Sequence, residues 1–135
     1  MQRRKFISDL GFTIAAACTA CLAACSKSGM NTPGNVNFNI DLNSDLLTVG
    51  SSTVQSGVIV VRLAASNVPA SFTAVQVACT HEGTPVNFNV PGDKFICPLH
   101  GSEFSTNGVV LMGPAGQNLK KFTVTINGNT LTVTG

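Results

Sequence analysis

Two short segments, each pairing a cysteine with a histidine, constrain the fold of this chain more than any other feature. They are Cys79-Thr80-His81-Glu82-Gly83 and Cys97-Pro98-Leu99-His100-Gly101-Ser102. The pattern reads C-x-H, fifteen further residues and then C-x2-H, and its two histidines are the only two in the 135-residue chain. Thiolate and imidazole groups are both metal ligands in proteins. If all four side chains serve one centre, the fold must bring the two segments together.

Alternation of apolar and polar residues predicts β-strands on both sides of each segment, because a period of two marks a strand with one buried face. The frequent Thr and Val residues also favour strands over helices. We expect strands at residues 36–42, 46–49, 58–63, 72–78, 86–90, 94–96, 108–112, 121–126 and 130–134. The run 58–63 is nearly all apolar, which predicts a central strand. No helix is expected after residue 25.

The turns between these strands have sequence signals of their own. Asn127-Gly128-Asn129 separates two alternating runs. Asn-Gly is typical of a hairpin with a type I′ turn, in which both central residues have positive φ. Pro91-Gly92-Asp93 predicts another turn. Each Cys/His segment therefore lies where a hairpin turns, and loops on a rigid scaffold are a usual place for function.

The first 24 residues have the composition of an export signal. Arg3 and Arg4 precede an apolar run over residues 10–24, and a basic start followed by a short apolar region is typical of such signals. A membrane-spanning helix would need about 20 apolar residues, so the run favours a signal over an anchor. Residues 2–7 resemble the twin-arginine motif, which directs the export of folded proteins.

A lipid attachment site is predicted at Cys25. Leu22-Ala23-Ala24-Cys25 resembles a lipobox, after which the cysteine is lipidated and becomes the new N-terminus. The alternative is that the cysteines of this region are merely small apolar residues in a discarded peptide. The polar residues 26–35 lack periodicity and have the composition of a flexible tether. We therefore expect a lipidated N-terminus and tether over residues 25–35.

Removal of residues 1–24 would leave a formally neutral chain. Five basic and five acidic residues remain, namely Lys27, Arg62, Lys94, Lys120 and Lys121 against Asp41, Asp45, Glu82, Asp93 and Glu103. Neither nucleic acid nor an anionic surface is therefore implied as a partner. Besides Cys25, the remaining cysteines are Cys79 and Cys97. In an oxidising compartment two such cysteines can form a disulfide, but a disulfide has no use for the adjacent histidines.

The two Cys/His segments resemble the signature of the Rieske iron-sulfur family. This resemblance implies a [2Fe-2S] cluster and an all-β domain over residues 36–135. The expected fold is an antiparallel β-sandwich or barrel, with a cluster-binding subdomain inserted at about residues 78–112.

By the same resemblance, Cys79 and Cys97 bind the inner iron, while His81 and His100 bind the outer iron. Zinc is the alternative metal, because thiolates and imidazoles satisfy it in a tetrahedron. In common zinc modules, however, cysteines pair with cysteines and histidines with histidines, whereas each segment here holds a mixed pair. Two imidazoles in place of two thiolates leave the oxidised cluster neutral instead of doubly negative, which favours the uptake of an electron.

Neighbouring residues would tune the cluster. By resemblance, Ser102 donates its hydroxyl to a bridging sulfide, while Gly83 and Gly101 allow backbone N–H groups to approach sulfur. Ordinary turn chemistry is the alternative explanation for the glycines. Gly113-Pro114-Ala115 is similar to the proline loop of the family, which covers one side of the cluster, so Pro114 is expected beside it.

Three positions depart from the respiratory members of the family. Thr84 and Leu99 stand where those proteins carry two further cysteines joined as a disulfide, so the cluster and packing alone are expected to hold the two segments together. Phe104 stands where a tyrosine bonds to a ligand cysteine, and it has no hydroxyl to offer. We therefore expect a reduction potential between the ferredoxin-like and the respiratory extremes.

These features predict an exported, membrane-tethered lipoprotein that transfers single electrons on the periplasmic or outer side of a bacterial membrane. Its partner would be a redox protein such as a c-type cytochrome, or a quinol-linked complex, docking at Pro98, Leu99, Pro114 and the histidine edges. Alternatively, the chain is the electron-transfer subunit of a larger oxidoreductase, either a quinol:cytochrome complex or a molybdenum enzyme. A structural zinc or disulfide protein is the third interpretation. No catalytic nucleophile-base pair is evident, since both histidines are predicted ligands.

Overall fold

The structure is a computed structural model and describes residues 33–135. That range contains ten β-strands and one short 3₁₀ helix. The elements are β1 (Asn37–Asp41), β2 (Ser52–Gln55), β3 (Val58–Arg62), η1 (Pro69–Ser71), β4 (Phe72–Gln76), β5 (Asn87–Asn89), β6 (Lys94–Ile96), β7 (Glu103–Ser105), β8 (Val110–Met112), β9 (Thr123–Asn127) and β10 (Thr130–Thr134). Every pairing between these strands is antiparallel, which confirms the predicted all-β class.

The predictions for the N-terminal segment lie outside the described residues. They concern Arg3 and Arg4, the export signal, the lipidated Cys25 and all but the last three residues of the tether. Across residues 33–135, no helix combines the length and the apolar character that crossing a membrane requires.

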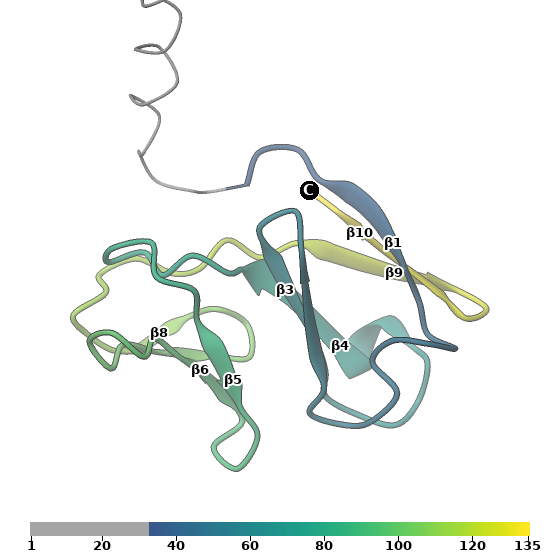
Figure 1. Ribbon diagram of the computed structural model, residues 1–135, viewed down its shortest axis with the longest axis horizontal. Coiled ribbons are helices and arrows are strands. Elements are labelled where there is room, and N and C mark those ends of the chain that lie inside the picture. The colour runs from purple at the N-terminus through teal and green to yellow at the C-terminus, as the bar shows by residue number, and fades with distance from the viewer. Residues whose placement is uncertain (1–32) are drawn as a thin grey trace, which may run out of the picture.

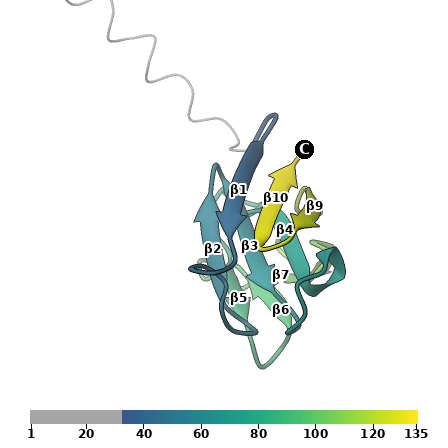
Figure 2. The same ribbon diagram turned by 90° about the vertical axis from the view of Figure 1, so that its right-hand side faces the viewer.

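Two three-stranded sheets form the base of the molecule, with strand orders β1-β10-β9 and β2-β3-β4 (Figure 1, Figure 2). In β1 the side chains alternate between the two faces, so Phe38 and Ile40 are buried while the polar residues between them are exposed. Leu131 and Val133 of β10 are fully buried. These side chains share one hydrophobic core with residues of β3 and β4, so the two sheets form a sandwich.

The strand β3 lies between β2 and β4 and is buried along its whole length, which confirms the prediction of a central strand. Its side chains divide between two cores. Val58 and Val60 belong to the core of the base sandwich, whereas Ile59 and Val61 pack into a second core beneath the Cys/His segments. A strand buried on both faces is mostly apolar, which explains why Val58 to Val61 do not alternate with polar residues.

The strands β5, β6, β7 and β8 form a four-stranded sheet between β4 and β9 in sequence. This sheet lies beside the base, at the left of Figure 1. Phe95 of β6 and Phe104 of β7 pair in register, and both are fully buried. Cys79 and Cys97 belong to the same hydrophobic cluster. The Cys/His segments thus start from a packed core, one between β4 and β5 and the other between β6 and β7.

The predicted strand at residues 46–49 is wrong. These residues form bends and a turn after β1, and Leu46 has a φ of 52°. The Leu46 side chain is nevertheless buried in the core of the base. A strand forms instead at β2, and β7 is a second strand that the alternation did not predict. The one-turn helix η1 is the only helix among the described residues.

The hairpin between β9 and β10 forms, but its turn lies one residue later than predicted. Asn127 pairs with Thr130, so the two loop residues are Gly128 and Asn129. Gly128 has a φ of 61°, whereas Asn129 is not among the residues with positive φ. A glycine at the first loop position, with positive φ there alone, is typical of a type II′ turn. The predicted type I′ turn at Asn127-Gly128 is therefore replaced by this one.

Candidate metal centre

The two Cys/His segments fold into the same backbone turn. In each, the cysteine carbonyl accepts a hydrogen bond from the N–H of the glycine four residues later. The cysteine N–H in turn donates to the carbonyl five residues later. The bonds are Gly83 N to Cys79 O at 2.8 Å, Cys79 N to Thr84 O at 2.8 Å, Gly101 N to Cys97 O at 2.9 Å, and Cys97 N to Ser102 O at 2.8 Å. The two loops therefore present Cys79 and Cys97 from equivalent backbone turns.

The conformation of these turns requires the two glycines. Gly83 has a φ of 79° and Gly101 a φ of 76°, in the left-handed region that side chains disfavour. A Cβ atom at either position would have no protein atom within 4 Å. Backbone conformation, and not crowding, therefore explains both glycines. Their predicted role in bringing N–H groups towards sulfur stays a prediction.

The two cysteines lie at the bottom of the loops as buried free thiols. Cys79 is 3% exposed and Cys97 is 2% exposed. Burial raises the pKa of the Cys79 thiol, the backbone N–H groups of His81 and Glu82 lower this pKa, and the neighbouring Cys97 thiol raises it further. Because bound thiols are deprotonated, a metal at this site would have to displace a proton that burial holds in place.

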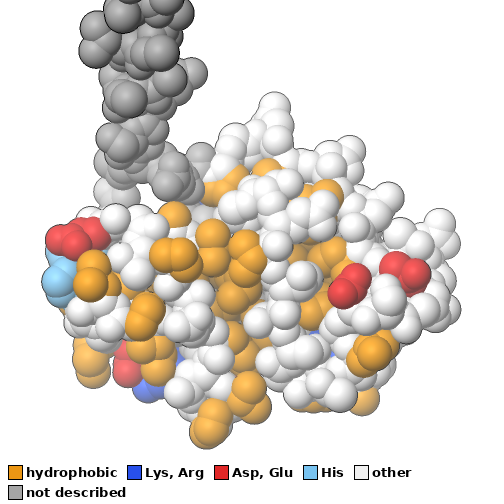
Figure 3. Space-filling model, in the orientation of Figure 1, with side chains coloured by type: hydrophobic (Ala, Val, Ile, Leu, Met, Phe, Trp, Pro, Cys, Tyr) orange, Lys and Arg blue, Asp and Glu red, His pale blue; other side chains and the backbone are white. Residues whose placement is uncertain are grey.

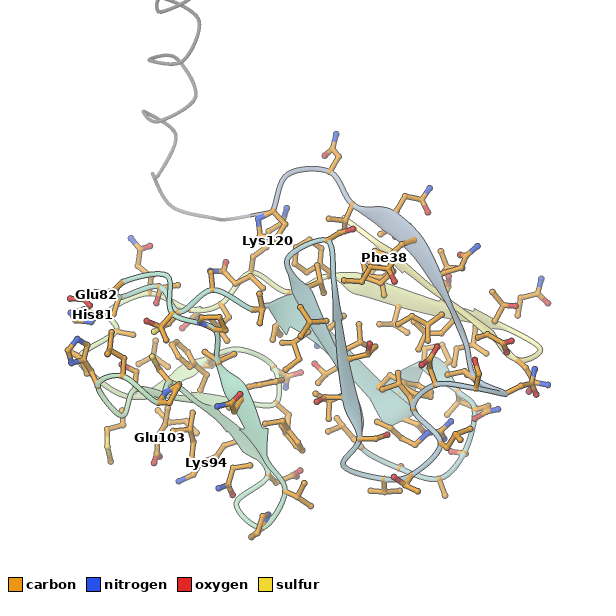
Figure 4. All side chains as sticks on the ribbon, viewed as in Figure 1. Phe38, His81, Glu82, Lys94, Glu103 and Lys120 are labelled. Carbon is orange, nitrogen blue, oxygen red and sulfur yellow. The ribbon has the colours of Figure 1, made fainter. Side chains whose placement is uncertain are left out.

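The two histidines lie at the outer edge of the same loops, where both are exposed. The rings of His81 and His100 meet edge to face, with centroids 4.9 Å apart and an angle of 81° between their planes. Nε2 of His100 lies 3.2 Å from Oε2 of Glu82, which comes from the other loop. Figure 4 labels His81 and Glu82 at this edge, and Figure 3 shows the histidines there in pale blue. The thiols therefore face inward and the imidazoles outward.

This arrangement fits a two-metal centre better than a single tetrahedral ion. Ligand atoms of one zinc ion lie about 2.0–2.3 Å from the metal and therefore within about 4 Å of one another. Among residues 33–135, one group of three potential ligands has its donor atoms within 4.8 Å of one another, formed by His81, Glu82 and His100. Neither cysteine belongs to it. Two thiols and two imidazoles in separate pairs match the ligand set of a Rieske-type [2Fe-2S] cluster.

Ser102 is fully buried beside the second loop. Its Oγ accepts a hydrogen bond of 3.0 Å from the backbone N–H of Ala115. A hydroxyl that accepts a hydrogen bond keeps its own hydrogen to donate, so this contact is compatible with the predicted bond to a sulfide. The first loop contacts the same segment, because Thr80 donates its hydroxyl to the carbonyl of Gln117 at 2.7 Å. The segment that contains Pro114 is therefore bonded to both loops.

The positions that depart from the respiratory pattern differ in their surroundings. Phe104 is fully buried and packs in the core beneath the loops. Leu99 is 54% exposed at the tip, and Thr84 is half-buried. Pro98 and Pro114 are exposed as well. The predicted docking residues are thus accessible, whereas Phe104 is buried in the core beneath the loops.

Two polar residues of this region were missed by the sequence predictions. Glu82 bonds to His100 across the loops. The sequence had predicted that the cluster and packing alone hold the two loops together, so this contact is an addition to that prediction. Gln76 is buried at the end of β4, where its Nε2 donates to Ala78 O at 2.7 Å and its Oε1 accepts from Lys120 N at 2.9 Å. A charged residue directly after a predicted ligand was the available signal for Glu82. No sequence signal marked Gln76, because it occupies an ordinary position within a strand.

Comparison with known proteins identifies the domain. Residues 39–123 match the Rieske [2Fe-2S] domain family. The cytochrome b6-f complex iron-sulfur subunit of Synechococcus sp. (strain JA-2-3B'a(2-13)) is 40% identical over 55 residues, which are 41% of this chain and 32% of that subunit. The chain thus corresponds to only part of that relative.

Solved structures give the same result over more of the chain. The cyanobacterial plasma membrane Rieske protein PetC3 from Synechocystis PCC 6803 is 33% identical, with a TM-score of 0.56 over 76% of this chain and 99% of that one. The ferredoxin of carbazole 1,9a-dioxygenase from Nocardioides aromaticivorans IC177 is 21% identical, with a TM-score of 0.56 over 73% of this chain and 95% of that one, and shares the fold. The chain therefore belongs to the Rieske [2Fe-2S] domain family, whose domain holds a [2Fe-2S] cluster.

Proposed function

We propose that this chain transfers single electrons through a [2Fe-2S] cluster. In this proposal Cys79 and Cys97 hold the inner iron, and His81 and His100 hold the outer iron. One observation carries the assignment: two loops of identical backbone form present two buried thiols below two exposed imidazoles that contact each other. The membership in the Rieske family supports the same assignment.

The ligands determine what this centre can do. When bound, the cluster would supply one-electron chemistry, because it can take up and release a single electron. Two neutral imidazoles in place of thiolates make electron uptake more favourable. The reduction potentials of such centres accordingly lie at roughly −150 to +300 mV. The buried cysteines are shielded by Phe95 and Phe104, while the exposed histidine rings offer the short path for an electron. Transfer therefore takes place at the histidine edge.

The surface around this edge supports docking to a redox partner. Leu99 is 54% exposed, and Pro98 and Pro114 are exposed near the histidines. Figure 3 shows hydrophobic side chains beside the histidines at this end of the molecule. An apolar surface next to the exposed ligands suits a partner that must approach the cluster closely, such as a c-type cytochrome or a quinol-linked complex.

The proposal includes export and attachment to the membrane through lipid at Cys25. It is supported by the Arg3-Arg4 pair, the apolar run and the lipobox-like residues that precede Cys25. The similar protein PetC3 from Synechocystis PCC 6803 is a plasma membrane Rieske protein, which supports this location. Globomycin, which blocks lipoprotein signal cleavage, should make the unprocessed chain accumulate, and Cys25→Ser should prevent labelling with a radioactive fatty acid. Labelling of Cys25→Ser at the wild-type level would contradict lipidation at this residue.

A second candidate function is that of an electron-transfer subunit in a larger oxidoreductase. It is favoured by the similarity to an iron-sulfur subunit of the cytochrome b6-f complex. Purification from its native membrane in mild detergent separates the two candidates. Co-purification of a catalytic subunit would favour the complex, whereas a monodisperse single chain would favour the independent carrier.

The decisive experiment is analysis of the intact protein for iron, acid-labile sulfide and zinc, together with its absorption spectrum. The expected result is two irons and two sulfides per chain, with a paramagnetic resonance signal after reduction by dithionite. A colourless protein that contains one zinc ion and gives no such signal would instead support the structural zinc interpretation.

A further inference from the structure

We propose that Glu82 positions the ring of His100 and lowers the reduction potential of the centre. The inference rests on the proposed function, since it takes His100 as a ligand. Oε2 of Glu82 lies 3.2 Å from Nε2 of His100, although the two residues belong to different loops and are 18 positions apart. Both side chains remain solvent-accessible, at 53% for Glu82 and 41% for His100. The carboxylate is therefore a connection between the two ligand loops.

The contact determines which ring nitrogen is available to the metal. Because Nε2 of His100 donates to the carboxylate, Nδ1 is the nitrogen left to bind iron. Metal-bound histidines commonly donate their second ring N–H to a carboxylate, which fixes the ring and makes it a stronger electron donor. A stronger donor and a nearby negative charge both stabilise the oxidised centre relative to the reduced one. Glu82 is thus expected to lower the potential.

The effect is directed at one of the two histidines. The hydrogen bonds of the described residues include none to the ring of His81, which meets His100 only edge to face. The other carboxylate near the loops, Glu103, is paired with Lys94 at 2.8 Å. In Figure 4 this pair is labelled away from the edge where Glu82 lies. Glu82 is therefore the carboxylate at the tip with access to a ligand ring.

Glu82 also connects the two loops, in which Thr84 and Leu99 stand where the resemblance to the respiratory proteins implies two disulfide-bonded cysteines. Besides this contact, each loop is bonded to the segment around Ala115 and Gln117, and the buried thiols of Cys79 and Cys97 neighbour each other beneath the two loops. Loss of the carboxylate should therefore loosen the orientation of His100 and accelerate cluster release.

The test uses full-length, cluster-loaded protein at fixed pH and ionic strength. Glu82→Gln keeps an amide oxygen that can accept from His100 but removes the charge. Asp93→Asn is the matched control, because it makes the same charge change at the opposite end of β6 from Cys97. Asp93 is exposed with a φ of 51°, a conformation that asparagine tolerates. Redox titration should show a higher potential for Glu82→Gln and a smaller shift for Asp93→Asn.

A second measurement separates positioning from charge. Glu82→Ala removes both the charge and the acceptor, and it should release iron to a chelator about tenfold faster than wild type, whereas Glu82→Gln should release it at close to the wild-type rate. An unmoved potential in Glu82→Gln, or an equal shift in Asp93→Asn, would refute the effect on potential. Iron release from Glu82→Ala at the wild-type rate would refute the positioning role. Wild-type protein without iron and sulfide would refute the proposed function itself, which distinguishes that failure from the other two.

Discussion

The Oγ atom of Ser102 accepts a hydrogen bond of 3.0 Å from the backbone N–H of Ala115, thirteen positions further along the chain. Both residues are buried. The contact joins the second ligand loop to the segment that contains Pro114, and it leaves the serine hydrogen free to donate to the cluster. One hydroxyl thereby serves the fold and, in our proposal, the cofactor.

Substitution of Ser102 by alanine tests both roles. Ser102→Ala leaves the N–H of Ala115 without its partner in a buried place, which should cost about 1–3 kcal/mol of unfolding free energy. Loss of the donor to a sulfide should lower the reduction potential, because such hydrogen bonds stabilise the reduced cluster. Urea unfolding and redox titration measure the two effects.

Ser105→Ala is the control for this prediction. The Oγ of Ser105 accepts from the N–H groups of Asn107 and Val109, both at 3.2 Å, in the turn after β7. Its loss should affect stability but leave the potential near the wild-type value. Equal potentials for Ser102→Ala and wild type would show that Ser102 serves the fold alone.

Phe104 is a position where a hydroxyl can be restored. By resemblance to the respiratory proteins, Phe104→Tyr should add a donor to a ligand cysteine and raise the potential. Phe95→Tyr is its control, since the two rings pair in register and both are fully buried. Either added hydroxyl should cost about 1–3 kcal/mol in the packed core, but only that at position 104 is expected to move the potential. A rise in both variants, or in neither, would contradict a specific role of this position.

The proposed metal ligands could be chosen from the sequence because their chemistry resides in the side-chain types and their spacing. Cys79, His81, Cys97 and His100 form a pattern that does not depend on the orientation of the loops. The contact between Glu82 and His100 does depend on it, since the two residues meet only after the loops face each other. Sequence therefore indicated the cofactor, whereas the residue that orients one ligand required the structure.

The strands show the same division between local and tertiary determinants. β6 and β10 have their predicted bounds, because alternation alone defines a strand with one buried face. The β9–β10 turn was predicted one residue too early. In either register Leu131 would face an apolar residue of β9, and the observed partner is Ile126. Alternation cannot choose between these two registers, so the register required the structure. Leu46 is a similar case. Its side chain is buried in the core of the base although the residue lies in a bend, so its apolar character was mistaken for that of a strand residue.

Replacement of a histidine ligand by cysteine tests the ligand assignment. His100→Cys exchanges a neutral ligand for an anionic one, so the potential should fall towards that of all-cysteine clusters, roughly −400 mV. Leu99→Cys is the control, because it adds a thiol to the same exposed loop without replacing a proposed ligand. Its potential should stay near the wild-type value. An unchanged redox titration of His100→Cys would refute the assignment of this histidine.

Arg62 is predicted to stabilise the base without affecting the cluster. It is 5% exposed, its guanidinium donates to the carbonyls of Leu46 and Ala65 and to the Asn67 side chain, and it stacks on Phe72 at 4.6 Å. A lysine cannot reproduce this planar set of donors, so Arg62→Lys should lower the unfolding free energy by about 2–3 kcal/mol. Urea unfolding measures the loss, and the potential of the folded variant should match wild type, because these contacts lie in the base. A variant as stable as wild type would show that these carbonyls find other donors.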